Sequence, residues 1–154
     1  MLDDPIRGHI LEYKWSGILI EPVRYLFDRL KNNYKNIENL IFENVAIAET
    51  GGLRYIYRYK ENQYNLLFWQ EGTASLLQNF SVRHKNLISN IEQCLTKEKV
   101  QCMTLDSLFK KYRIKKINLL VIDVEGYEYE IMKTLDFNTI KPKIIFFEHQ
   151  CLSH

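Results

Sequence analysis

Cysteine is scarce in this sequence, which has only Cys94, Cys102 and Cys151 among its 154 residues. Their number is odd, and no spacing is that of a CxxC pair or of paired Cys and His ligands. The sequence therefore predicts neither a disulfide framework nor a zinc site, and it predicts no other metal site. A reducing compartment, the cytoplasm, fits this cysteine content best.

An excess of charge of one sign is also missing, because 21 Lys and Arg residues are balanced by 19 Asp and Glu residues. A net charge of +2 gives no strong footprint for a polyanion, so nucleic acid is not predicted as a partner. The basic run over 110–116 is interpreted as the solvated end of a helix. No apolar run approaches the ~18 residues of a membrane span, and the first residues carry acids where a signal peptide carries bases. No membrane association is predicted.

Glycine and proline are few as well, with six and three residues, and no internal repeat is visible. The apolar fraction of 46% and the charged fraction of 26% are those of an ordinary globular protein. A chain of this length is enough for one hydrophobic core and too short for two separate ones. We therefore expect a single domain over residues 1–154.

Hydrophobic periodicity predicts the order of the elements. Helices are predicted over 5–14, 22–34 and 127–135. A further helix is predicted to follow a cap at Asp106, and the segment 81–99 is predicted to be a loop followed by a helix. Strands are predicted over 16–22, 39–49, 100–105, 117–123 and 141–150, and from residue 53, where Tyr alternates with other residues. Strands that are apolar on both faces and alternate with helices indicate a parallel sheet covered by helices, the doubly wound α/β class.

Three of the predicted strands end in an acid: Glu21, Asp123 and Glu148. A single carboxylate at a strand end is usually the cap of the next helix. Ligands of open α/β sheets, however, bind at the carboxyl ends of the strands, so three acids there indicate a binding site.

Each acid suits a different task. Glu21 can accept hydrogen bonds from both hydroxyls of a ribose, or cap the helix that starts at Pro22. Asp123 can bind an ammonium group or orient a hydroxyl, and Gly126 permits a tight turn close to a ligand. Glu148 and His149 place an acid beside a base that titrates near neutrality. The other histidines are assigned to structural roles.

The segments "GILIEPVRYLFDRLKNNY", "NLIFENVAIAE", "TLDSLF" and "INLLVIDVEGYEYEIMKTLDF" with "KPKIIFFEH" resemble the FkbM family of S-adenosylmethionine-dependent methyltransferases, in the same order. The resemblance covers nearly the whole chain, and the I-D-V-E-G run is its most specific part. It implies a Rossmann-like methyltransferase fold, with a mostly parallel sheet and helices on both faces. It also implies S-adenosylmethionine as cofactor and a hydroxyl acceptor on a sugar, another glycan or a small natural product.

Site residues carried over by the resemblance fall into four groups. Glu21 matches the acid that binds the cofactor's ribose, and Asn44, Val45 and Ala46 match the stretch near the adenine. Asp123, Glu125 and Gly126 match the motif near the methionine moiety and the acceptor. Glu148 with His149 matches the edge of the fifth strand. We expect Asp123 or His149 to take the proton of the acceptor hydroxyl.

The sequence departs from the family at both ends. The glycine-rich D-x-G-A-N-x-G loop that follows the family's first strand is absent, and the chain stops where relatives add two strands. The expectation is therefore a partial domain, truncated at both ends. Without the first strand, the strands that hold Glu21 and Asp123 must pair directly, leave open edges or recruit another chain.

Two other functions remain to be weighed. A methyltransferase-like fragment or interaction module with impaired catalysis is the alternative that the missing glycine loop favours. A nicotinamide-binding domain is disfavoured, because G-x-G-x-x-G occurs nowhere in the chain.

Overall fold

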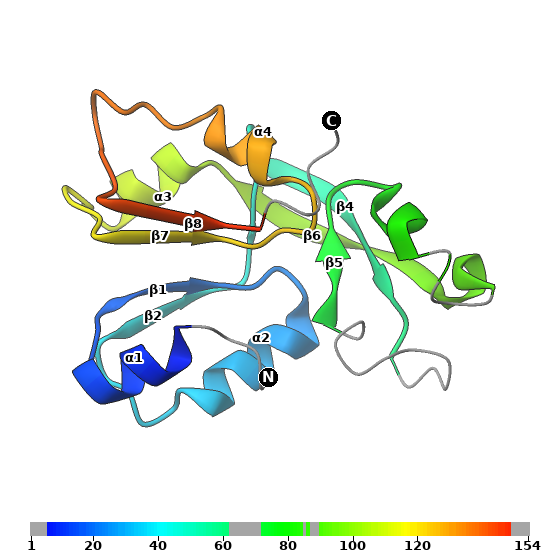
Figure 1. Ribbon diagram of the computed structural model, residues 1–154, viewed down its shortest axis with the longest axis horizontal. Helices are drawn as coiled ribbons and strands as arrows, with labels where there is room; N and C mark the ends of the chain where they lie inside the picture. Colours follow the sequence, from blue (N-terminus) through cyan, green and yellow to red (C-terminus); the bar gives the residue numbers. More distant parts are fainter. Residues whose placement is uncertain (1–5, 62–71, 85, 87–89, 149–154) are drawn as a thin grey trace. The chain divides into compact units, whose positions relative to one another are not determined.

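The computed structural model describes residues 6–61, 72–84, 86 and 90–148. The chain divides into two compact units, residues 1–46 and residues 47–154, and each is described by itself. The single domain expected over residues 1–154 stays a prediction. Figure 1 shows the elements of both units with their labels.

The first unit is a strand–helix–strand motif preceded by a helix. Its elements are α1 (Arg7–Tyr13), β1 (Gly17–Ile20), α2 (Arg24–Asn33) and β2 (Leu40–Glu43). β1 and β2 are parallel, with register from Gly17↔Leu40 to Ile20↔Glu43. The helices pack on one face of this strand pair (Figure 1), where Ile10, Leu30 and Tyr34 form a buried cluster against side chains of both strands. The helix–strand–helix order predicted for this region is confirmed.

The second unit contains a four-stranded sheet in the order β3-β6-β4-β5. Its strands are β3 (Ala46–Ile47), β4 (Gly52–Tyr59), β5 (Ala74–Ser75) and β6 (Leu95–Met103). β4 is antiparallel to both of its neighbours, so the expectation of a mostly parallel sheet is wrong for this part of the chain. The β element predicted over 39–49 is two strands, β2 and β3, in different sheets.

The helix predicted within 81–99 is also wrong. Two short 3-10 turns, η2 (Phe80–His84) and η3 (Ile91–Cys94), are followed by the nine-residue strand β6. The strand predicted over 100–105 is the end of β6. Polar composition concealed the first part of β6, because Lys97 and Lys99 lie over the ring of Tyr55 on β4 and form a solvated face. An exposed face of lysines therefore reads as a loop although its backbone is fully paired with β4.

A second parallel strand pair follows. Its elements are α3 (Leu105–Lys111), β7 (Leu119–Ile122), α4 (Glu128–Met132) and β8 (Ile144–Phe147). β7 and β8 pair in register from Leu119↔Ile144 to Ile122↔Phe147. The cap of α3 is Thr104, whose hydroxyl accepts from Ser107 N at 3.0 Å, and not Asp106, which lies in the first turn.

The α/β class is confirmed, but one continuous parallel sheet is not formed among the described strands. β1 hydrogen-bonds only to β2 and β7 only to β8 in the described ranges, so direct pairing of the strands that precede Glu21 and Asp123 is not seen. Within the same residues, no helix has the length and apolar character needed to cross a bilayer.

Buried polar groups of the second unit have clear structural roles. Tyr59 packs with Phe80, Ile91 and Cys94, and its hydroxyl lies 2.6 Å from Nδ1 of the buried His84. The structural role expected for His84 is confirmed. Cys102 on β6 is a buried thiol, and desolvation by burial raises the pKa of this group above its usual range.

Candidate functional site

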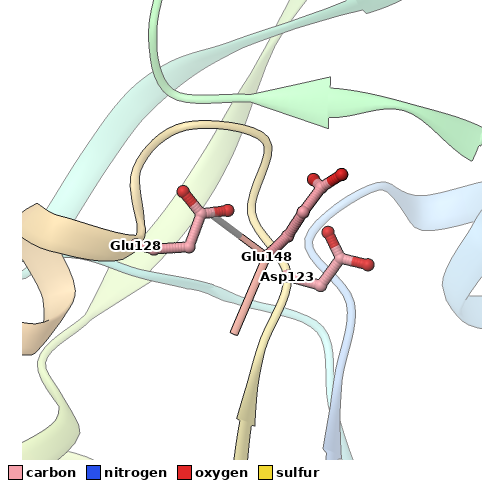
Figure 2. A group of neighbouring side chains, drawn as sticks. All are labelled: Asp123, Glu128 and Glu148. Carbon is pink, nitrogen blue, oxygen red and sulfur yellow. The ribbon is translucent and has the colours of Figure 1, made fainter. Parts of the chain in front are cut away.

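Three carboxylates meet at the carboxyl ends of β7 and β8. Asp123 follows β7 and Glu148 follows β8, and the last strand pair is Ile122↔Phe147. Because the strands are parallel and in register, the residues that follow them share one edge of the sheet. Glu128, the first residue of α4, joins them there (Figure 2). One carboxylate oxygen of each residue lies within 4.8 Å of the others. We call these three residues the acidic cluster.

Exposure differs sharply within the acidic cluster. Asp123 is exposed and Glu148 is half-buried, whereas Glu128 has 0% of its surface exposed. The sequence predicted that Asp123 and Glu148 lie at the carboxyl-end edge of the sheet, and the structure places them at the carboxyl ends of β7 and β8.

The loop between β7 and α4 is folded around Glu128. Glu125 and Gly126 both have left-handed backbone conformations, with φ of 57° and 101°, so the turn relies on glycine at the second position. This turn directs two backbone amides inward, and Oε1 of Glu128 accepts from Val124 N at 3.0 Å and from Gly126 N at 3.2 Å. Oε2 of Glu128 is buried and receives no hydrogen bond from the residues that the structure describes.

A second polar cluster holds the end of the same loop. The Tyr127 hydroxyl donates a short hydrogen bond to Glu49 and accepts from Nη1 of Arg54 at 3.0 Å. Arg54 also binds both oxygens of Glu49, each at 3.0 Å. We call Glu49, Arg54 and Tyr127 the anchor cluster. It ties the start of α4 to β4 and to the segment after β3.

Electrostatics of the anchor cluster follow from these contacts. Hydrogen bonds from Arg54 and then Tyr127 lower the pKa of Glu49 to about 2. Burial, and secondly the hydrogen bond to Glu49, raises the pKa of Tyr127 above its usual range. At neutral pH the cluster therefore contains one guanidinium, one carboxylate and a neutral phenol, and its charges balance.

Glu21 and Asn44 lie at the carboxyl ends of β1 and β2 in the first unit. Oε1 of Glu21 accepts from Val23 N at 2.8 Å. Val23 is the residue before the first helical residue of α2, and α2 has no side-chain cap among the described residues, so the helix-capping role weighed for Glu21 is not seen. Nδ2 of Asn44 donates to the carbonyls of Glu21 and Pro22, at 2.8 and 2.9 Å. Val45 and Ala46, which follow Asn44, are buried. The structure therefore brings Glu21 and Asn44 together, with Asn44 as the residue that holds the turn.

His149 lies outside the described residues. Glu128, in contrast, was missed by sequence reasoning, although a signal was present. Glu128 and Ile131 are three residues apart and share the buried face of α4. A carboxylate at a core position of a helix is rare, and this position alone would have singled it out.

The acidic cluster is suited to two kinds of chemistry. Its ligand atoms are all oxygens of carboxylic acids, which accept hydrogen bonds and protons from hydroxyl groups. Three such groups close together also repel one another and attract cations. A site of this kind can orient a hydroxyl, accept its proton or hold a positive group.

Comparison with models of protein families gives a match to the methyltransferase FkbM domain over residues 3–152. The match includes both units and every site residue named above. No curated protein and no solved structure matches the chain.

Proposed function

The chain belongs to the FkbM methyltransferase domain family, and on that premise we propose that it moves a methyl group from S-adenosylmethionine to a hydroxyl oxygen of an acceptor. The acceptor class proposed is a sugar, another glycan or a small natural product. The observation that carries this proposal is the family match over residues 3–152. The acidic cluster supports the choice of a hydroxyl acceptor, because carboxylates at a ligand edge can bind a hydroxyl and take its proton.

The donor set of the first unit fits the ribose of S-adenosylmethionine. A ribose presents two hydroxyls, and Glu21 offers a carboxylate at the carboxyl end of a parallel strand, where such ligands bind. One of its oxygens already holds Val23 N, which fixes the direction of the side chain. Because Val45 and Ala46 are buried, we propose that their contribution near the adenine comes from the backbone.

S-adenosylmethionine supplies an electrophilic methyl group when it is bound. The protein then has two tasks, which are to place the acceptor oxygen in line and to remove its proton. We assign proton removal to Asp123, which is the exposed member of the acidic cluster. Glu148 is proposed to orient the same hydroxyl, and His149 is the second candidate for the base. Glu125 and Gly126 shape the loop that carries Asp123.

Calorimetric titration of the chain with S-adenosylmethionine tests the first half of the proposal. We expect saturable heat of binding, and we expect Glu21→Gln to weaken binding by about tenfold or more, because a charge-assisted hydrogen bond contributes ~1.5–3 kcal/mol. Asp28→Asn on α2 is the matched control, since Asp28 is exposed and forms a surface ion pair with Arg24. Its binding should equal that of the wild type.

The second half is tested by transfer of a labelled methyl group to a panel of polyhydroxylated acceptors. Label that stays in base-stable ether linkages supports O-methylation. Absence of both heat and transfer would contradict the proposal and favour the methyltransferase-like interaction module. Heat of S-adenosylmethionine binding without methyl transfer to any hydroxyl would support the proposed cofactor and contradict the proposed acceptor class.

A further inference from the structure

We propose that the acidic cluster of Asp123, Glu128 and Glu148 is a binding site for a divalent cation. Sequence reasoning predicted no metal site, because it weighed cysteine and histidine spacing and not carboxylates that converge only in the fold. One oxygen of each carboxylate lies within 4.8 Å of the others (Figure 2). Two oxygens on opposite sides of a Ca²⁺ ion are about 5 Å apart, so a single ion can contact all three.

The buried oxygen of Glu128 is the observation that points to an ion. A cluster of exposed acids needs no ligand, since water solvates each one. Glu128 is different, because its surface is fully buried and no group in the described part of the chain donates to its Oε2. A buried carboxylate oxygen without a partner is unfavourable, because it has lost its water and gained no donor in return. A cation in the acidic cluster would provide the missing partner and relieve the repulsion among the three charges.

The surrounding structure leaves Oε1 and Oε2 of Glu128 with different roles. Oε1 is held by Val124 N and Gly126 N, so the carboxylate cannot rotate away without breaking two backbone hydrogen bonds. Tyr127, next to Glu128, is fixed by Glu49 and Arg54. The loop is thus tied on both sides of the site. A pre-organised carboxylate of this kind is what a metal site requires.

The donor atoms define the class of cation. All three are carboxylate oxygens, which suit the hard cations Ca²⁺, Mg²⁺ and Mn²⁺. Zn²⁺ prefers nitrogen and sulfur ligands, and the described members of the site include neither. Three protein oxygens leave several coordination positions of such an ion for water or for oxygens of a ligand.

Use of the ion in methyl transfer rests on the proposed function, whereas the ion site itself does not. If the acceptor hydroxyl binds at an open coordination position, the ion lowers the pKa of that hydroxyl. A carboxylate can bind an ion through one oxygen and accept a proton at the other, so Asp123 can serve both tasks. Binding of the ion can be measured without cofactor or acceptor, which keeps the two proposals separable.

Titration of the whole chain with Mn²⁺, followed by the loss of the free-ion electron paramagnetic resonance signal, tests the site. We expect saturable binding of about one ion per chain, and competition by Ca²⁺. Glu128→Gln should weaken Mn²⁺ binding by more than about tenfold, because it removes the charge of a ligand and leaves the shape unchanged. Asp123→Asn should do the same, and since Asp123 is exposed, this variant does not depend on core packing.

Glu130→Gln is the matched control. It lies two residues from Glu128 on the same helix, where it forms an exposed ion pair with Lys133. Its Mn²⁺ affinity should equal that of the wild type, and circular dichroism should show that every variant is folded. Should Glu128→Gln fail to fold, Asp123→Asn decides the question. Absence of saturable Mn²⁺ binding, or equal binding by Asp123→Asn and Glu130→Gln, would overturn the proposal.

Discussion

Two polar clusters hold the two sides of one short loop, and they differ in charge balance. In the anchor cluster, Arg54 binds both oxygens of Glu49, and the hydroxyl of Tyr127 completes the hydrogen bonds. In the acidic cluster, three carboxylates converge, and one buried oxygen, Oε2 of Glu128, has no hydrogen-bond donor among the described residues. The first cluster balances its charges within the protein, whereas in the second the buried Oε2 of Glu128 is the group that a ligand would satisfy.

This difference separates polar groups that stabilise the fold from polar groups that are available to bind a ligand. Polar groups that satisfy one another stabilise a fold, and they gain nothing from a ligand. Polar groups that are held together while their requirements are unmet carry an energetic penalty that a ligand can remove. On this basis, removing a charge from the anchor cluster should lower stability. Removing a charge from the acidic cluster, with the backbone hydrogen bonds of Glu128 kept, should lower binding and turnover.

The largest effect is expected for Asp123→Asn. Loss of a general base typically lowers turnover by a factor of ~10²–10⁴, so methyl transfer should fall by at least about 100-fold. The measurement is initial rate with labelled S-adenosylmethionine at saturating acceptor. Unchanged turnover would show that Asp123 is not the base, and it would contradict the catalytic role assigned to the acidic cluster.

Glu128→Ala should have the next largest effect, this time on stability. The substitution leaves Val124 N and Gly126 N, which are half-buried, without their acceptor, and an unmet donor of this kind is unfavourable by ~1–3 kcal/mol. We expect the free energy of unfolding in urea to fall by about 3 kcal/mol. Glu128→Gln keeps the acceptor oxygen and should lose much less. Equal losses for the two variants would show that charge, and not the backbone hydrogen bonds, makes Glu128 important for the loop.

Glu49→Gln should destabilise the fold in a pH-dependent way. The folded-state pKa of Glu49 is lowered from 4.5 to about 2, so its ionised form is the one that the fold stabilises. That stabilisation is fully present above pH 4.5 and is lost as the pH falls toward 2.

At neutral pH the variant should be less stable than the wild type by about 1 kcal/mol, since the pair is partly exposed and screened by solvent. Urea unfolding at a series of pH values should show this difference shrink as the pH falls through that window. A constant difference would mean that the Arg54–Glu49 charge pair is not its cause.

Asp106→Asn should have the smallest effect on stability, and it serves as the control for the loss of an exposed carboxylate. Asp106 forms an exposed pair with Lys110 at 2.7 Å, and such helix pairs contribute only ~0.3–0.5 kcal/mol. Urea unfolding should reveal a loss no greater than that, and the rate of methyl transfer should be unchanged. A larger loss would show that exposed acids in this protein matter generally, which would weaken the contrast between the two named clusters.

Much of the fold around the site is predictable from local pattern. β1, α2, β7 and β8 were predicted because their apolar residues recur at the spacing of a strand or a helix. Asp123 and Glu148 were placed at one edge because they end two such strands. These inferences need only the chain near each residue, together with the rule that ligands bind at the carboxyl ends of parallel strands.

Features that depend on distant partners were not predictable in the same way. The first part of β6 was hidden, because its lysines are explained only by Tyr55 on another strand. The anchor cluster joins Glu49 and Tyr127, which are far apart in the sequence. The acidic cluster was not predicted as a unit, because the sequence analysis considered ligand spacing, whereas carboxylates from two strands and a helix can meet without any regular spacing.

The rate at which the buried thiol of Cys102 reacts with a labelling reagent can report local opening of the four-stranded sheet. Cys102 faces Gly52 across the β4–β6 ladder, so a thiol reagent can reach it only when that ladder opens. In a Cys151→Ser background with Cys94 also replaced by Ser, the rate of labelling would report the frequency of this opening. Ligand binding that rigidifies the anchor cluster would then slow a reaction on a strand that touches no ligand.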